Sequence, residues 1–227
     1  MNDDTRAEAI ALCESRAGLY RLIATLYFQP LSQEQIDALA ASDIADAASE
    51  EGSPFAIAYA DLSKALRLRH SGTKETLAAD YTGAFYGIRT VSGRTAQPFQ
   101  SLFEANALGL MGEARSEVYR TLKAHALRVP AGADLPEDHL SFICEYLAFL
   151  CDETAATLRE QRDEDATSLI RDQRAFFETH VASWFPTFHA IADQIVETRF
   201  YRGVLNLTEA FIAEEAAMLD DLERLLS

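Results

Sequence analysis

The sequence predicts an all-α fold, on three observations. Apolar residues recur at three- and four-residue spacing over long stretches, as they do along one buried face of a helix. No segment alternates apolar and polar residues as a half-buried strand does, and no repeat of fixed period is present. The length of 227 residues is enough for one large domain or two small lobes. We therefore expect a bundle of about ten helices.

Three helices are expected in the first third of the chain. Residues 5–28 carry two apolar stripes, so this helix should be buried on most of its circumference, and Pro30 should end it. Residues 32–41 begin with a capping box and form a short helix. Ser53 and the proline after it should start a third helix, over 53–69.

A fourth helix is expected over 73–87, capped by Thr73. Its apolar stripe is Leu77, Tyr81, Ala84, Phe85 and Ile88. The loop 89–100 contains breaker residues and little periodicity, which makes it a candidate functional loop. A second capping box should open a short helix over 101–110, and another helix should follow Gly112 as far as about residue 127.

Residues 128–135, with a proline and a glycine, are the best hinge in the chain, and a long helix should follow them. Pro136 should set the start of that helix, and Asp138 lies in the expected first turn, where acids suit the positive end of the helix dipole. His139 stands at the mouth of the apolar face, beside a polar stripe that includes Glu145. Helix-capping chemistry around a half-buried ring is the first explanation of this cluster, and a functional site is the alternative.

Two further helices complete the C-terminal part. One apolar stripe crosses Pro186, which should kink or split its helix. Residues 199–203 are expected to form the last break, before a terminal helix over 204–226. The chain would then divide into an N-terminal lobe (1–127), the hinge and a C-terminal lobe (136–227), unless the lobes pack as one domain.

Composition narrows the classes of partner. Acids outnumber bases 36 to 20, for a formal charge of −16, which argues against nucleic acids and anionic membrane surfaces. The N-terminus lacks the features of a secretory signal, and no apolar stretch is long enough to span a bilayer. We therefore expect a cytoplasmic protein without stable membrane insertion. An acidic surface would attract a basic ligand, although acidity also serves solubility alone.

Known catalytic and cofactor motifs are missing from the sequence. It contains no phosphate-binding glycine loop, no HExxH and no Glu-x-x-His pair, and its histidines do not stand with cysteines at zinc spacing. Cys13, Cys144 and Cys151 fall within apolar helical stripes, where thiols are usually inert. The sequence thus predicts neither an enzyme nor a bound metal or cofactor.

Six segments, in this order and at these spacings, carry a family likeness. They are YFQP (27–30), DYTGAFYG (80–87), PFQSLF (98–103), LPEDHLSFICEYLAFL (135–150), HVASWFPTF (180–188) and FYRGVLNLTEAFI (200–212). With them the chain resembles the TorD/DmsD/NarJ family of cytoplasmic chaperones for molybdenum-containing oxidoreductases. The resemblance implies a helical protein of two linked parts that binds the N-terminal twin-arginine leader of a client enzyme. It would hold the client until cofactor insertion and block premature export.

The resemblance also implies positions that contact the leader. Carried over by matching position, they are Tyr81, Phe85, Phe99, Ser101, Pro136, Asp138 and His139. The first two lie on the buried stripe, so core packing is an equal alternative for them. Asp138 and Glu145 are the acids expected to meet a leader arginine. Some relatives carry tryptophans at 81 and 99, a bulky aliphatic residue at 84 and a double proline in the loop 88–97, so the leader recognised here can differ.

Two other functions remain open at this stage. A helical adaptor or regulatory protein would bind a folded partner without leader recognition, and an enzyme would use His139 as acid or base.

For a chaperone of this family, the expected partners are the leader and catalytic subunit of a molybdopterin oxidoreductase. The protein would be a monomer or a dimer, and the hinge 128–135 would permit domain swapping.

Overall fold

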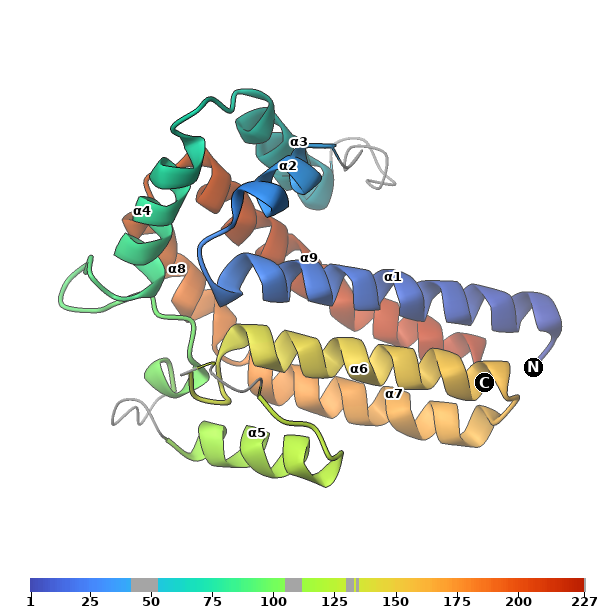
Figure 1. The fold of residues 1–227 in the computed structure, drawn as a ribbon. Coiled ribbons are helices and arrows are strands. Elements are labelled where there is room, and N and C mark those ends of the chain that lie inside the picture. Colours follow the sequence, from blue (N-terminus) through green and yellow to red (C-terminus); the bar gives the residue numbers. More distant parts are fainter. Residues whose placement is uncertain (42–52, 105–111, 130–132, 134, 227) are drawn as a thin grey trace. The chain divides into compact units, whose positions relative to one another are not determined.

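The computed structural model describes residues 1–41, 53–104, 112–129, 133 and 135–226. Across these residues all regular structure is helical, which confirms the all-α prediction (Figure 1). The elements in chain order are α1 (Asp3–Phe28), α2 (Gln33–Ala41), α3 (Pro54–Arg67), α4 (Thr73–Phe85), the 3₁₀-helix η2 (Gln100–Leu102), α5 (Glu113–Ala124), α6 (Leu140–Arg159), α7 (Asp163–Phe177), the π-helix η3 (Glu178–Ala182), α8 (Phe185–Ile195) and α9 (Arg199–Leu225). None of the helices described is long and apolar enough to cross a membrane.

The chain forms two compact units, each built from separate segments. Unit 1 comprises Met1–Thr25, Phe99–Trp184 and Glu214–Ser227, and unit 2 comprises Leu26–Pro98 and Phe185–Ala213. These units do not follow the order of the chain, whereas the sequence suggested lobes divided at 128–135. Residues 130–132 and 134 lie outside the described part, and the hinge stays a prediction.

In unit 1, α1, α6, α7 and the last part of α9 lie side by side (Figure 1). A buried polar network joins them: Arg16 of α1 pairs with Glu215 of α9 and donates to Gln173 Oε1 of α7 (2.8 Å). Gln173 in turn donates to Thr154 Oγ1 of α6 (2.7 Å). Because an unpaired buried charge costs several kcal/mol, this network fixes one register of the four helices.

Unit 2 contains α2, α3, α4, α8 and the first part of α9. Aromatic rings form its centre, and neighbouring ring centroids lie 5.2–6.2 Å apart. They belong to Tyr27, Tyr81, Phe85, Phe188 and Tyr201. Asp80 of α4 accepts hydrogen bonds from the backbone N–H groups of Glu197 (3.0 Å) and Thr198 (2.8 Å). This carboxylate therefore caps the start of α9 across 117 residues of sequence.

The starts of α2 and α3 agree with the capping signals. Ser32 and Gln35 make both bonds of the capping box at α2, and Ser53 Oγ accepts the N–H of Ala56 at α3. The apolar stripe across Pro186 is split, as predicted, because η3 precedes α8 and the proline is the second residue of α8.

The starts of α4 and α9 differ from the prediction. Thr73 is the first residue of α4, and its hydroxyl accepts the N–H of His70 instead of capping the helix. The expected break at 199–203 is already helical, with Gly203 inside α9, where a Cβ would meet Leu62 Cγ at 3.1 Å. Close packing of two helices, and not a chain break, thus explains this glycine.

The second capping box is also not formed. Ser101 lies within η2, and its Oγ is buried without a hydrogen-bond partner among the described residues. The rest of the expected helix, 105–110, lies outside the described part.

Candidate functional site

The motif around Asp138 forms a turn in unit 1, and α6 begins only after it. The N–H of His139 donates to the carbonyl of Pro136 (3.2 Å), and α6 starts at Leu140. The expected helix start at Pro136 is therefore wrong, and Asp138 is not in a first helical turn. The turn instead pairs with the 99–101 segment, through a bridge between Phe99 and His139.

Asp138 joins these two segments. Its Oδ2 accepts the N–H of Ser101 (2.9 Å), and its carbonyl accepts the N–H of Gln100 (3.1 Å). The residue is fully buried. Of the two roles considered for this carboxylate, capping is thus realised, but on a distant segment that sequence periodicity does not reveal.

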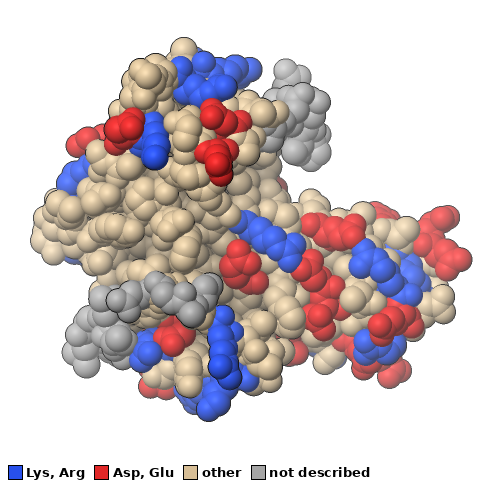
Figure 2. Space-filling model, viewed as in Figure 1, with Lys and Arg blue, Asp and Glu red and all other residues tan. Residues whose placement is uncertain are grey.

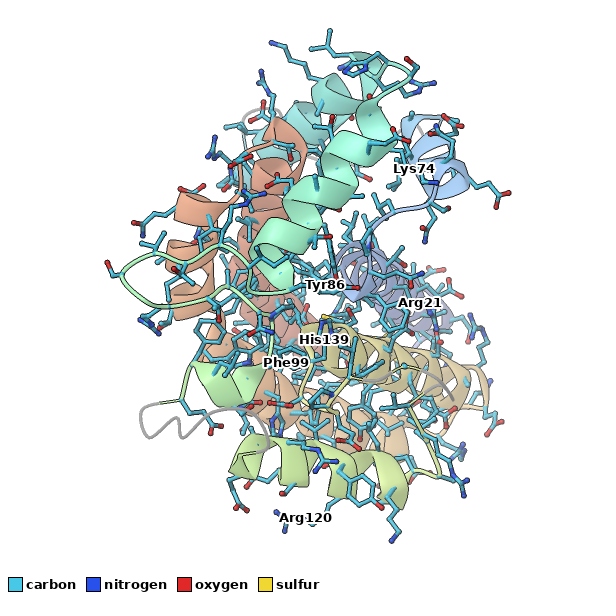
Figure 3. All side chains as sticks on the ribbon, turned by 60° about the vertical axis from the view of Figure 1, so that its left-hand side comes forward. Arg21, Lys74, Tyr86, Phe99, Arg120 and His139 are labelled. Atoms are coloured by element: carbon cyan, nitrogen blue, oxygen red, sulfur yellow. The ribbon has the colours of Figure 1, made fainter. Side chains whose placement is uncertain are left out.

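His139 is the N-cap of α6 and is 2% exposed, so its ring is buried more deeply than expected. Its Nδ1 accepts the N–H of Ser141 (3.1 Å), which requires this nitrogen to be unprotonated. Burial lowers the pKa of His139 to about 3, so the ring is neutral at pH 7. Phe99 packs edge-on against it, with ring centroids 4.9 Å apart, and Figure 3 shows the two side by side.

The neighbouring Gln100 ties the same segment to the π-helix. Its Nε2 donates to the carbonyl of Thr179 (3.1 Å) and to Glu104 Oε1 (3.2 Å), so its Oε1 faces Nδ1 of His180 (2.9 Å). His180 must therefore carry its proton on Nδ1, the opposite tautomer to His139. The π-helix η3 thus holds the 99–101 segment in place through Gln100. Such π-helical turns are frequent at functional sites.

Three side-chain oxygens at this turn are buried without a hydrogen-bond partner among the described residues. They are Ser101 Oγ, Asp138 Oδ1 and Ser141 Oγ. An unpaired buried polar atom costs about 1–3 kcal/mol, so such a cluster calls for a function or an additional partner. Burial, and then the charge of Asp138, raises the pKa of the nearby Glu104.

Glu145 lies on α6, one turn beyond the buried start of the helix, and it is exposed. No described residue forms an ion pair with it, whereas Asp152 on the same helix pairs with Arg21. Burial raises its pKa, with a smaller opposing effect of Arg21. Pro136 is partly exposed beside the turn. Unit 1 therefore contains six of the predicted residues: Phe99, Ser101, Pro136, Asp138, His139 and Glu145.

Tyr81 and Phe85 belong to unit 2 and are 1% and 2% exposed. The Tyr81 hydroxyl donates to the carbonyl of Tyr27 (2.7 Å), and both rings belong to the aromatic centre described above. The structure thus places them in the core, and contact with a leader stays a prediction for them.

The exposed apolar residues at the end of α4 were missed. Tyr86 is 50% and Ile88 69% exposed, although Ile88 was expected on the buried stripe. Gly87 between them has a φ of 74°, so the helix ends there and Ile88 turns away from the core. Gly87, which follows two aromatic residues, was the available sequence signal for the exposure of Ile88. A glycine that ends a helix turns the next residue away from the helical stripe.

The family relationship follows from comparison with known proteins. A family model described as nitrate reductase delta subunit matches residues 49–190. The chaperone protein TorD of Vibrio cholerae El Tor N16961 is 28% identical over 223 residues, covering 93% of this chain and 94% of its own. TorD of Vibrio vulnificus YJ016 is 27% identical over 209 residues (90% and 94%), and TorD of Shewanella amazonensis is 28% identical over 251 (96% and 99%). Because the family model spans more than half of the residues, the chain belongs to the nitrate reductase delta subunit family, which agrees with the resemblance to TorD, DmsD and NarJ.

Proposed function

We propose that this protein is a cytoplasmic chaperone, not an enzyme, that serves one molybdenum-cofactor oxidoreductase. It binds the N-terminal leader of the catalytic subunit, holds the subunit for cofactor insertion and prevents premature export. Membership of the family supports the chaperone role, since relatives named TorD match this chain over about nine-tenths of its length. The proposed recognition of a twin-arginine leader rests on the geometry of unit 1.

The observation that carries leader binding is the turn of unit 1. Asp138 in the turn and Glu104, two residues after η2, interact electrostatically, and Glu145 lies further along α6; no described cation forms an ion pair with any of these three carboxylates. Asp138 is buried and acts as a positioning residue, because it holds the 99–101 segment. Glu145 is exposed and is the acid to which a leader arginine would bind.

Calorimetric titration with the synthetic twin-arginine leader of a molybdenum oxidoreductase from the same organism tests this assignment. We expect Glu145→Gln to weaken binding by about tenfold, because a charged hydrogen bond to arginine contributes about 1.5–3 kcal/mol. Glu153→Gln is the matched control, since Glu153 is an exposed acid on the same helix, about 12 Å further along its axis.

Equal affinities for the two variants would contradict the role of Glu145. A leader whose two arginines are replaced by glutamine should bind the wild type at least as weakly as the original leader binds Glu145→Gln. If neither leader binds at all, while the full-length catalytic subunit does, the adaptor function without leader recognition is correct.

A further inference from the structure

We infer that unit 2 carries a second interaction surface, of opposite charge, which binds an acidic segment of a partner protein through an apolar anchor. The surface consists of the end of α3, the turn after it and the first turn of α4, residues 64–77, with the start of α9 beside them. It does not depend on leader binding, because its residues and its ligand differ from those of the turn in unit 1.

The positive charge of this surface is unusual for so acidic a chain. Most arginines form ion pairs with carboxylates, including Arg69 with Asp37 (3.5 Å) and Arg199 with Asp61 at the edge of this surface. By contrast, Lys64, Arg67 and Lys74 are exposed and form no ion pair with any described residue. Figure 2 shows Lys and Arg side chains gathered at the upper edge of the molecule, over the end of α3.

The electrostatic field of residues 64–74 also favours an acidic ligand. From residue 64 to 74 it contains four lysines and arginines and no acid, and the first acid after it is Glu75. The first turn of α4, from which Lys74 extends in Figure 3, adds the positive end of a helix dipole. The exposed cations and the start of α4 therefore attract an acidic ligand, against the smaller opposing charge of Glu75 and of the carboxyl end of α3.

A pocket of about 220 Å³ lies within the surface. Its apolar lining comes from Leu66, Leu68, Leu77 and Phe200, and its polar rim includes His70 and Thr73. Leu68 is 69% exposed, so its side chain in this lining is accessible to a ligand. The volume suits one bulky apolar side chain and is below the range of most small-molecule sites, about 300–1,000 Å³.

These features together define the partner. An apolar anchor in a pocket, ringed by charges, is the usual anatomy of a protein–protein hot spot. The cations are spread over two helices, so a single anion cannot neutralise them together, whereas a chain with acids on both sides of an apolar residue can. The surface fits a peptide segment of this kind.

Titration with a short synthetic peptide in which Asp and Glu flank a Leu-Phe pair tests the inference, followed by ¹H–¹⁵N NMR. We expect shift changes at residues 64–77 and 198–200, and an affinity at least tenfold lower for Lys64→Glu/Arg67→Glu/Lys74→Glu. The control Lys123→Glu/Arg128→Glu/Arg171→Glu changes the net charge equally at exposed cations elsewhere and should bind like the wild type.

Leu68→Ser tests the anchor separately, and it should weaken binding several-fold without lowering the melting temperature, since this side chain is exposed. Equal affinity of both triple variants would overturn the inference, because only net charge would then matter. Equal shifts with inorganic phosphate, or with a peptide in which Asn and Gln replace the acids, would also overturn it. Leader titrations of the same variants keep this result separate from the proposed chaperone function.

Discussion

The hydrogen bond that His139 Nδ1 accepts from the N–H of Ser141 requires a neutral imidazole ring. Its folded pKa is about 3 and the ordinary value is 6.5, so between these pH values the unfolded chain binds a proton that the folded protein does not. Stability therefore falls as the pH drops below 6.5, by up to about 1.4 kcal/mol per pH unit for this group, and the loss levels off near pH 3. Burial of His180, with a pKa of about 4, adds a second loss in the same direction.

The variant His139→Ser isolates this effect. Serine also caps helices, but it does not titrate, so the variant should show a flatter decline of unfolding free energy between pH 6.5 and pH 4 than the wild type. Urea denaturation at a series of pH values measures it. Parallel profiles for wild type and variant would mean that His139 is protonated in the folded protein, contrary to the Nδ1 bond with Ser141.

Phe85 and Tyr86 are neighbours with opposite environments, which makes them a matched pair. Phe85→Ala should cost about 3–5 kcal/mol of unfolding free energy, because the ring is buried among aromatic residues. Tyr86→Ala should cost less than about 1 kcal/mol and reduce leader affinity, if the exposed ring contributes to the apolar contact. Thermal melts measure the stability of both variants, and calorimetric titrations measure their affinity for the leader. A Tyr86→Ala protein with full leader affinity would exclude a contact between Tyr86 and the leader.

At the scale of the element, periodicity and caps predicted the helices well. The stripes over 5–28 and 53–69 gave α1 and α3 within two residues at each end. Two of the wrong helix starts share a cause: at Asp138 and Asp80, a carboxylate binds backbone N–H groups of a remote segment. The sequence identifies such residues as capping types but contains no sign of which segment they cap.

The guanidinium of Arg89 packs directly against Gly83 of α4. Arg89 donates to the carbonyl of Ile195 (2.7 Å) and pairs with Asp80 (3.0 Å), and its guanidinium occupies the space where residue 83 would have a Cβ. Gly83→Ala should therefore displace Arg89 and cost about 1–3 kcal/mol, although alanine favours a helix.

A double-mutant cycle measured by urea denaturation checks this. Gly83→Ala with Arg89→Ala should cost clearly less than the sum of the two single variants, because the overlap then disappears. Gly18→Ala is the control, since no atom lies near its position in α1, and it should be neutral or stabilising. Additive costs would show that Gly83 is needed for a reason other than Arg89.

At the scale of the whole molecule, the all-α class and the family were predictable, whereas the two units were not. Each unit is assembled from segments far apart in the chain, and α1 and α9 contribute to both. Periodicity reports which face of a helix is buried, but not what covers it. For the same reason Tyr81 and Phe85 could be read as groove or core, until the structure placed them among buried rings.

We expect the net charge of −16 to affect the rate of the proposed leader binding more than the lifetime of the complex. An acidic protein steers a basic peptide towards it, so the association rate constant should fall about tenfold or more between low and high salt, as the screening length shrinks from about 10 Å at 0.1 M towards 3 Å at 1 M. The dissociation rate constant reports the close contacts, and it should change much less. Stopped-flow measurements at several salt concentrations separate the two. A leader with both arginines replaced by glutamine should associate slowly at all salt concentrations; if it shows the same salt dependence as the original leader, attraction between its arginines and the acidic protein does not drive the encounter.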